Sequence, residues 1–271
     1  MLTDEVRRHC AAVAASARHV RIDSGAEIEL GGIAGLDEQL HFLEGAPAEV
    51  TRYVLILDAI NFGSGWFGEL GTGTDALTER LTAHARADGP WTEAQLRALD
   101  ARAVGATLGL DPAHRLTHLY AEALNDLGAF LPVDLGDRAE ILAERLTAMP
   151  FFADTGFYKR AQIAAHDLHL AGVVAYPDID RLTIFADNLV PHVLRLEGVL
   201  HYDDDLAELI DTGTELPAGG EHEREVRACA VHACETIARR AGVPAATLDN
   251  WLWNRGREHG GRPHVTRTVY Y

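Results

Sequence analysis

Apolar residues recur along most of this chain three or four positions apart, the spacing of one face of an α helix. Between 158 and 174 they fall at Ala161, Ala164, Leu168 and Ala171. Similar patterns predict further helices over about 4–19, 112–130, 137–149, 191–198, 203–213, 222–241 and 244–254. Two of these, joined near residue 198, predict a helical hairpin. We therefore expect a mainly α fold.

Local signals mark some helix ends and two non-helical segments. Thr92 and Gln95 form a predicted capping box, and Pro112, Asp137 and the acids at 203–205 are expected to begin or cap helices. Alternating apolar residues at 20–22 and 28–30 flank a turn sequence and predict a small β hairpin near the N terminus. The alternating residues 264–271 predict a strand or an ordered tail.

The composition is that of a globular protein from a reducing compartment. Hydrophobic residues make up 47% of the 271 residues and charged residues 24%. Three cysteines without a C-x-x-C spacing argue against a disulfide framework and a cysteine zinc site. No membrane span or secretory leader is apparent, and no linker or repeat divides the chain. We expect one cytoplasmic domain over residues 1–271.

The charge balance bears on possible partners. With 24 Lys and Arg against 41 Asp and Glu, the net charge is −17. Affinity for long nucleic acids comes largely from phosphate neutralisation, so we expect no polymeric nucleic acid partner. One small phosphate needs only a local cation. Lys159 is the only lysine in the sequence, and its compact ammonium suits a tight site that an arginine would not fit. The alternative is that a single lysine remains in the sequence by chance.

Two motifs suggest cofactors that the context does not support. Residues 63–68 match G-x-G-x-x-G, but Asp58 and Asn61 interrupt the supposed preceding strand and no βαβ pattern follows, which argues against a dinucleotide site. His166 and His169 lie three residues apart on a predicted helix, yet no HExxH or similar ligand set accompanies them. We therefore expect neither a metal nor an organic cofactor.

Acidic residues interrupt two apolar segments where a buried charge is costly. Asp58 lies in 53–62, and on a helix it shares a face with Asn61 and Phe62, a set suited to a flat polar heterocycle or to a structural network with an arginine. Asp187 lies in 182–191, just before a predicted helix that it would otherwise cap. Tyr158, Lys159 and Arg160 place two cations beside an aromatic ring, as a phosphate site requires.

Several uncommon strings occur together and in order from about Tyr53 to the C terminus. They are LILDAINF, FYKRAQI, LTIFADNLVP, LEGVLHYDDDL, EREVRACAVHA, LDNWLW and RTVYY. With them, the chain resembles the queuosine salvage protein family of queuosine 5′-phosphate N-glycosylase/hydrolases. The resemblance implies a helical fold similar to helix-hairpin-helix DNA glycosylases. It also implies hydrolysis of the N-glycosidic bond of queuosine 5′-monophosphate, which releases queuine for salvage, together with ribose 5-phosphate.

The resemblance also implies roles for residues that match the family motifs. Asp187 would be the catalytic carboxylate that faces the anomeric carbon, and Lys159 would act on the ribose or phosphate side. The expected substrate-binding residues are Asp58, Asn61, Phe62, Tyr158, Arg160 and Trp253. Glu223, Glu225 and Arg227 either close a buried ion network behind the pocket or have an ordinary structural role.

We therefore expect a monomeric N-glycosidase that acts on a small-molecule nucleotide, independent of membranes. Two alternatives remain open at this point. One is an N-glycosidase for another modified nucleotide. The other is a helix-hairpin-helix module that binds nucleic acid, which the net charge of −17 disfavours.

Overall fold

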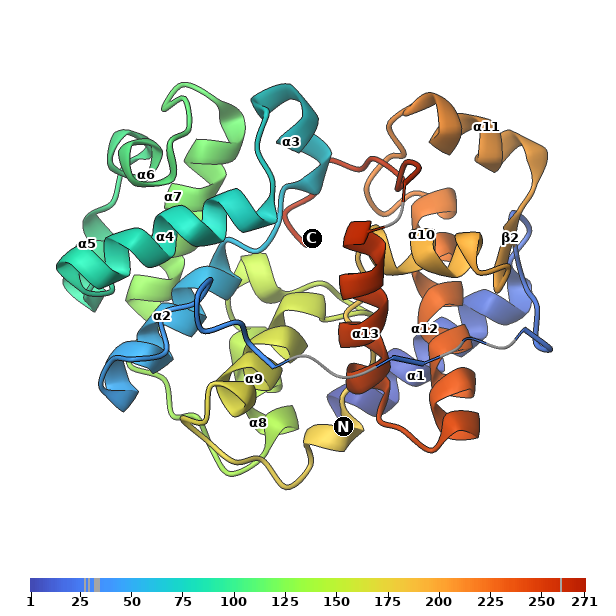
Figure 1. Cartoon of the computed structure of the whole chain (residues 1–271), viewed down its shortest axis with the longest axis horizontal. Helices are drawn as coiled ribbons and strands as arrows, with labels where there is room; N and C mark the ends of the chain where they lie inside the picture. Colours follow the sequence, from blue (N-terminus) through green and yellow to red (C-terminus); the bar gives the residue numbers. More distant parts are fainter. Residues whose placement is uncertain (27, 29, 32–34, 259) are drawn as a thin grey trace.

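The computed structural model describes residues 1–26, 28, 30–31, 35–258 and 260–271 (Figure 1). Within them the chain forms α helices, two 3-10 turns and two short strands. The elements are α1 (Leu2–Ser16), β1 (Val20–Ile22), α2 (Pro47–Ala59), α3 (Ser64–Leu70), α4 (Thr74–Asp88), α5 (Glu93–Ala98), α6 (Ala101–Leu108), α7 (Arg115–Phe130), α8 (Ala139–Leu146), η1 (Pro150–Phe152), α9 (Lys159–Leu170), η2 (Ile179–Arg181), α10 (Leu189–Leu196), β2 (Leu200–Tyr202), α11 (Asp204–Thr212), α12 (Glu221–Ala241) and α13 (Ala245–Glu258). The predicted mainly α fold class is confirmed.

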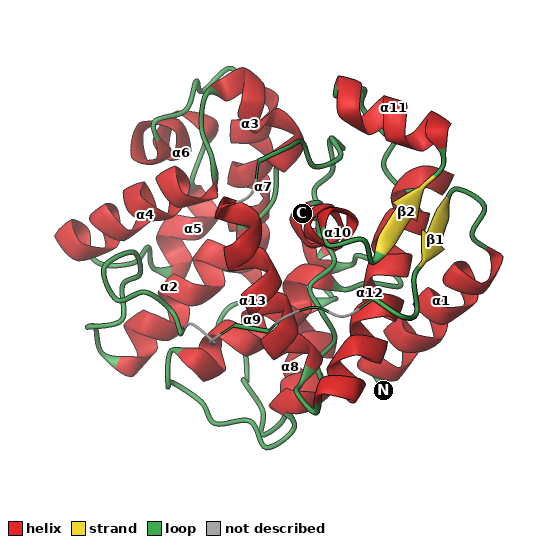
Figure 2. Ribbon diagram, turned by 45° about the vertical axis from the view of Figure 1, so that its right-hand side comes forward, coloured by secondary structure: helices red, strands yellow, loops and turns green. Residues whose placement is uncertain are grey.

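The small antiparallel sheet near the N terminus joins distant parts of the chain. Val20 of β1 lies opposite Tyr202 of β2, and Ile22 lies opposite Leu200. Figure 2 shows the two strands side by side next to α1 and α12. The sheet therefore exists, but its second strand is not the neighbouring segment 28–30; residues 27 and 29 of that segment lie outside the described residues.

β2 also changes the predicted helical hairpin. It lies between α10 and α11, where the sequence suggested a simple turn around residue 198. Backbone pairing with β1 explains the difference, because 200–202 gain hydrogen bonds from a segment about 180 residues earlier that no local pattern reveals. The resemblance to helix-hairpin-helix glycosylases stays a prediction.

Helix starts followed the local signals where the cap is local. The Thr92 hydroxyl accepts a hydrogen bond from the Gln95 amide (3.3 Å), and the Gln95 side chain accepts one from the Thr92 amide (2.8 Å), which confirms the capping box. Asp203 likewise accepts from Leu206 N (2.9 Å) and caps α11.

Two other predicted helix starts are wrong. The expected start at Pro112 falls three residues before α7, because the His114 ring caps that helix by accepting from Leu116 N (3.1 Å). Asp137 does not cap α8; instead Asp178, which is distant in sequence, accepts from Ala139 N (2.8 Å).

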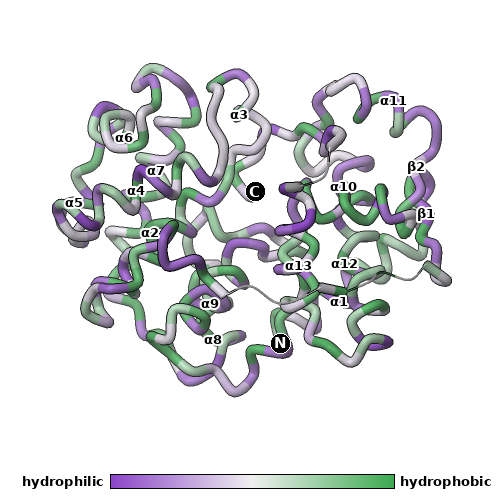
Figure 3. Tube along the Cα trace, viewed as in Figure 1, coloured by the Kyte–Doolittle hydropathy of each residue, from purple (hydrophilic) through white to green (hydrophobic). Residues whose placement is uncertain are grey.

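The helices pack around one connected core, with α9 at its centre. α9 contacts both α2 and α8, while α1 packs on α12, α5 on α7 and α10 on α13. In Figure 1, α2 to α7 form one side of the molecule and α1 with α10 to α13 the other. Green and purple segments alternate along the helices in Figure 3, as expected for amphipathic helices. The division of the chain into a single domain stays a prediction. Within the described residues, no helix is both long and apolar enough to cross a membrane.

The residues at 264–271 form an ordered tail that connects the two sides. Val265 forms an isolated parallel bridge with Glu215, and its carbonyl accepts from Leu216 N (2.8 Å). At the far end, the Tyr271 carbonyl accepts from Gly63 N (3.0 Å), just before α3. The G-x-G-x-x-G segment therefore follows helix α2 and not a strand, and it packs against this tail.

Gly65 allows the close approach of the tail to α3. A Cβ atom at this position would lie 2.6 Å from the Thr266 carbonyl carbon and 2.9 Å from Arg267 N, so the backbone of the tail would have to move. Gly68, on the same helix, has open space around its Cβ direction.

We predict that Gly65→Ala lowers the free energy of unfolding by about 1–3 kcal/mol through overpacking. Gly68→Ala is the matched control; it should leave stability unchanged or raise it by up to about 1 kcal/mol through helix propensity. Chemical denaturation of both variants checks this. Equal stabilities for the two variants would contradict the close packing of the tail on α3.

Candidate active site

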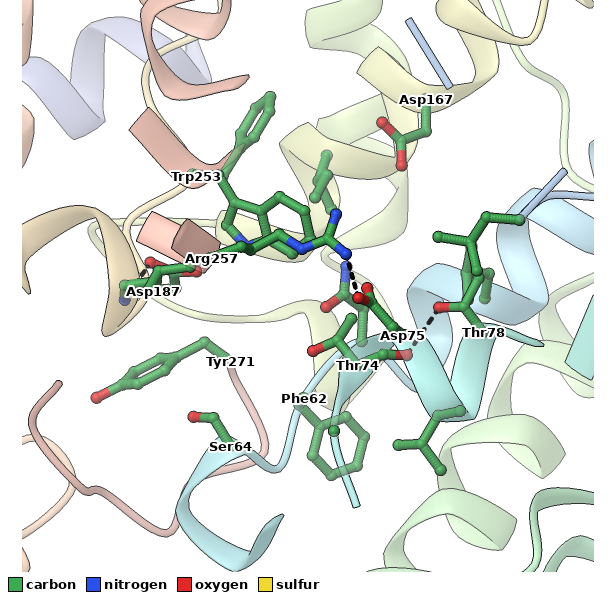
Figure 4. A pocket seen from close by; sticks show the side chains of 18 of the residues that line it. Phe62, Ser64, Thr74, Asp75, Thr78, Asp167, Asp187, Trp253, Arg257 and Tyr271 are labelled. Carbon is green, nitrogen blue, oxygen red and sulfur yellow. Dashed lines mark hydrogen bonds and ion pairs between the residues drawn. The ribbon is translucent and has the colours of Figure 1, made fainter. Parts of the chain in front are cut away.

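A cavity of about 640 Å³ opens between the two sides of the molecule. Its walls come from α2, α4, α9, α13, the segment before α10 and the C-terminal tail (Figure 4). Of the eight residues expected to act in catalysis or substrate binding, five line it: Asn61, Phe62, Lys159, Asp187 and Trp253. His166, considered above as a metal ligand, lines it as well. The fold therefore brings residues almost 200 positions apart into one site.

Asp187 lies just before α10 and is buried, with 8% of the residue exposed. Its Oδ1 accepts hydrogen bonds from Leu189 N (2.8 Å) and Val190 N (3.0 Å). The residue thus caps the helix, as one interpretation of the sequence suggested, and also lines the cavity. Burial raises the pKa of Asp187, while the positive charge of Lys159, the two backbone amides and Arg227 lower it. These groups all favour the anion.

Lys159 is the first residue of α9 and faces the same cavity. Its Nζ donates to the backbone carbonyl of Asn61 (3.4 Å) and to the side-chain Oδ1 of Asn61 (3.3 Å). Burial lowers the pKa of Lys159, and the negative charge of Asp187 raises it. Each of the two charges therefore supports the ionised form of the other.

Asp58 is the second-last residue of α2 and is fully buried, whereas Asn61 follows the end of that helix. Neither carboxyl oxygen has a hydrogen-bond partner of good geometry among the described residues, although the Asn61 side chain lies close enough to favour the anion. Burial raises the pKa of Asp58 well above its ordinary value, and the charge of Asp167 adds to this, while Lys159 opposes it. The residue is not in the cavity lining, so direct contact with a ligand stays a prediction.

Arg160 and Tyr158 lie outside the cavity lining, so their contact with a substrate stays a prediction, as for Asp58. The buried Arg160 guanidinium donates to the carbonyls of Ala59 (2.6 Å) and Val269 (2.7 Å). The Tyr158 hydroxyl donates to Glu5 on α1 (2.9 Å). Successive helix residues point about 100° apart, so Lys159 faces the cavity while Arg160 faces the core.

The structure adds Asp249, which sequence reasoning missed. It lies on α13, one turn before Trp253, and lines the cavity. Its Oδ1 accepts from Phe185 N (2.8 Å), which ties α13 to the segment that carries Asp187. Burial and the charge of Asp187 raise the pKa of Asp249 well above its ordinary value. The i, i+4 spacing from Trp253 in LDNWLW could have revealed it.

An ion pair crosses the mouth of the cavity. Arg257, near the end of α13, bonds to Asp75 in the first turn of α4, and its guanidinium lies 5.0 Å from the centre of the Trp253 ring. Figure 4 shows this pair joining the two walls. Each charge sits at the helix end where the helix dipole stabilises it. The helices predicted from the sequence do not include α4, so this pair could not be anticipated.

The two histidines at 166 and 169 have other partners. The His169 ring accepts from Tyr176 N (3.0 Å), and His166 lies 3.5 Å from the carboxylate of its neighbour Asp167. In the part of the chain that the structure describes, no three His, Cys, Asp or Glu side chains are grouped as metal ligands.

Comparison with known proteins gives consistent results. The sequence model of the family described as queuosine salvage protein matches residues 151–271. A protein of Sphaerobacter thermophilus named queuosine 5′-phosphate N-glycosylase/hydrolase is 30% identical over 276 residues, covering 87% of this chain and 85% of that protein.

Proteins of the same name from Dictyostelium discoideum and Mus musculus are 37% and 35% identical over 127 and 136 residues. Each match covers 42% of this chain and 40% of the relative. Because the Sphaerobacter protein matches along most of both chains, and the family model covers the segments that carry Lys159 and Asp187, this chain belongs to the queuosine salvage protein family.

Proposed function

We propose that this protein hydrolyses the N-glycosidic bond of queuosine 5′-monophosphate and releases queuine and ribose 5-phosphate. The observation that carries the proposal is the burial of Asp187 and Lys159 together in one cavity, each at the start of a helix. The identity of the substrate is taken from the relatives described above, which are named queuosine 5′-phosphate N-glycosylase/hydrolase.

Asp187 is the proposed catalytic carboxylate. Cleavage of the bond develops positive charge on the ribose, and an anion held against the anomeric carbon stabilises that charge. Oδ1 is fixed by the α10 amides, so the carboxylate is oriented before the substrate arrives. In the net reaction, the hydroxyl of water goes to the anomeric carbon and its proton to the departing base. The same anion can attack directly or orient the water.

Lys159 has two proposed tasks. Its charge favours the anionic form of Asp187, and its ammonium, which has a third N–H besides the two that Asn61 accepts, would bind the ribose or the 5′-phosphate. On the base side, we propose that Trp253 and Phe62 stack on the heterocycle while Asn61 offers its amide. Asp58, behind Asn61, would then act through its neighbours or after a local shift.

Free nucleotide is the proposed substrate, and we propose that the protein works as a monomer in the cytoplasm. The net charge of −17 supports a mononucleotide over a polymer, because each additional phosphate adds repulsion. A local cation such as Lys159 suffices for one phosphate.

Asp187→Asn tests the catalytic role. We expect kcat to fall about 100- to 1000-fold, because shape is kept and the charge that stabilises the transition state is lost. KM should change little. The measurement is release of queuine from queuosine 5′-monophosphate at saturating substrate. Asp137→Asn, at an exposed loop position, is the control and should retain full activity. Undiminished turnover by Asp187→Asn would exclude Asp187 from catalysis.

Lys159→Met tests the phosphate contact. We expect kcat/KM to fall about 10- to 100-fold more for queuosine 5′-monophosphate than for queuosine, since a charge-assisted hydrogen bond contributes about 1.5–3 kcal/mol. The effect on Asp187 is common to both substrates and cancels in the ratio. Arg102→Met, at an exposed position on α6, should leave both values unchanged. Equal losses on the two substrates would place Lys159 away from the phosphate.

A further inference from the structure

A buried ion network lies directly behind the cavity. Arg227 on α12 is 2% exposed, and its guanidinium donates to both oxygens of Asp154 (3.2 and 2.5 Å) and to Glu223 Oε1 (3.2 Å). Asp154 and Glu223 are buried as well. Glu225, the third residue that the sequence suggested for such a network, lies elsewhere and accepts from His19 N (2.8 Å).

Two aromatic rings pack against the guanidinium. Its central carbon lies 3.9 Å from the centre of the Phe157 ring and 4.6 Å from that of Tyr271. A planar fork with several fixed donors fits this position, whereas a lysine ammonium would keep the charge but lose the paired bonds and the stacking.

Each partner of the network leads to a residue that lines the cavity. Arg227 Nε donates to the carbonyl of Ala186, which directly precedes Asp187 (3.0 Å). Asp154 Oδ2 accepts from the backbone amide of Lys159 (3.4 Å).

Glu223 Oε1 in turn accepts from the Tyr271 hydroxyl (3.0 Å). Asp154, Glu223 and Arg227 are themselves absent from the described lining. One arginine therefore connects the segments that carry Asp187, Lys159 and Tyr271.

Stability alone is a weak reason for such a network. Burying charges carries a large desolvation cost, and well-packed apolar residues often stabilise a core as well or better. Apolar residues can supply neither the directed hydrogen bond to the Ala186 carbonyl nor the positive charge near Asp187.

We propose that Arg227 is a positioning residue that, through Asp154 and the carbonyl of Ala186, fixes the carboxylate of Asp187 relative to the ammonium of Lys159. This inference rests on the proposed function of Asp187. Arg227 does not touch the substrate in this account. Its effect reaches the reaction only through the placement and charge of Asp187.

Other charged groups also face Asp187. Lys159 of α9 and Arg227 of α12 favour its anion, as do the α10 backbone amides, whereas the acid Asp249 of α13 lies nearby with its own pKa raised. From the tail, His264 contacts the Tyr271 hydroxyl (3.0 Å). Burial and the charge of Arg227 lower the pKa of His264 to about 3. His264 is therefore neutral across the working range. Loss of the Arg227 charge would make Asp187 easier to protonate.

The test compares Arg227→Lys and Arg227→Met with the wild type and with Asp187→Asn. Glu140→Gln is the control: Glu140 is a buried carboxylate paired with Arg181 and lies outside the cavity lining. The measurements are kcat, KM and the pH dependence of kcat with queuosine 5′-monophosphate, with the folded fraction of each variant measured by thermal denaturation.

We expect kcat to fall about 10- to 100-fold in Arg227→Lys, the effect of a small misplacement of a catalytic group, with KM within about 2-fold. The acid limb of its pH profile should stay in place because the charge is kept. In Arg227→Met kcat should fall further, and the acid limb should move to higher pH because the pKa of Asp187 rises. Glu140→Gln should lose stability but keep the profile.

Folded Arg227 variants with wild-type kcat and an unmoved acid limb would overturn the inference. The inference would also fail if the loss of kcat in the Arg227 variants equalled their loss of folded protein and Glu140→Gln showed the same loss. If Arg227→Met does not fold, the kcat of Arg227→Lys decides. Failure of the wild type to release queuine would instead overturn the proposed function, so the two failures are distinguishable.

Discussion

The mutual support of two buried opposite charges is the interaction on which this site depends. Removal from water disfavours the ionised form of both Asp187 and Lys159, and each is also the group that favours ionisation of the other. Loss of either charge therefore makes the ionised form of the other group less favourable. In the proposed reaction Asp187 acts as an anion, because the positive charge that develops on the ribose needs a fixed negative partner with little water around it.

Much of the fold can be understood as holding these two groups in place. Asp187 precedes α10 and Lys159 begins α9, so helix ends orient both residues. The network around Arg227 joins their backbones from behind, and the C-terminal tail closes one wall of the cavity where Gly65 lets it approach α3. The sheet of β1 and β2 and the packing of α1 on α12 then hold this half of the molecule together.

Several parts of this arrangement were predictable from the sequence, and others were not. Acidic residues inside apolar runs indicate buried charges, which is why Asp58 and Asp187 could be selected, and Lys159 stood out as the only lysine. Adjacency in sequence does not place Arg160 and Tyr158 in the cavity lining beside Lys159, since neighbours in sequence point in different directions around a helix end. The pairing of β1 with β2 and the cap that Asp178 gives α8 depend on contacts between distant segments, which no local pattern records.

The most direct measurement is a crystal structure of the Asp187→Asn variant with intact queuosine 5′-monophosphate. The account predicts an anomeric carbon facing the side chain at 187, the phosphoribose within reach of Lys159, and the base against Trp253 and Asn61. A nucleotide bound elsewhere, or one whose anomeric carbon points away from position 187, would contradict it.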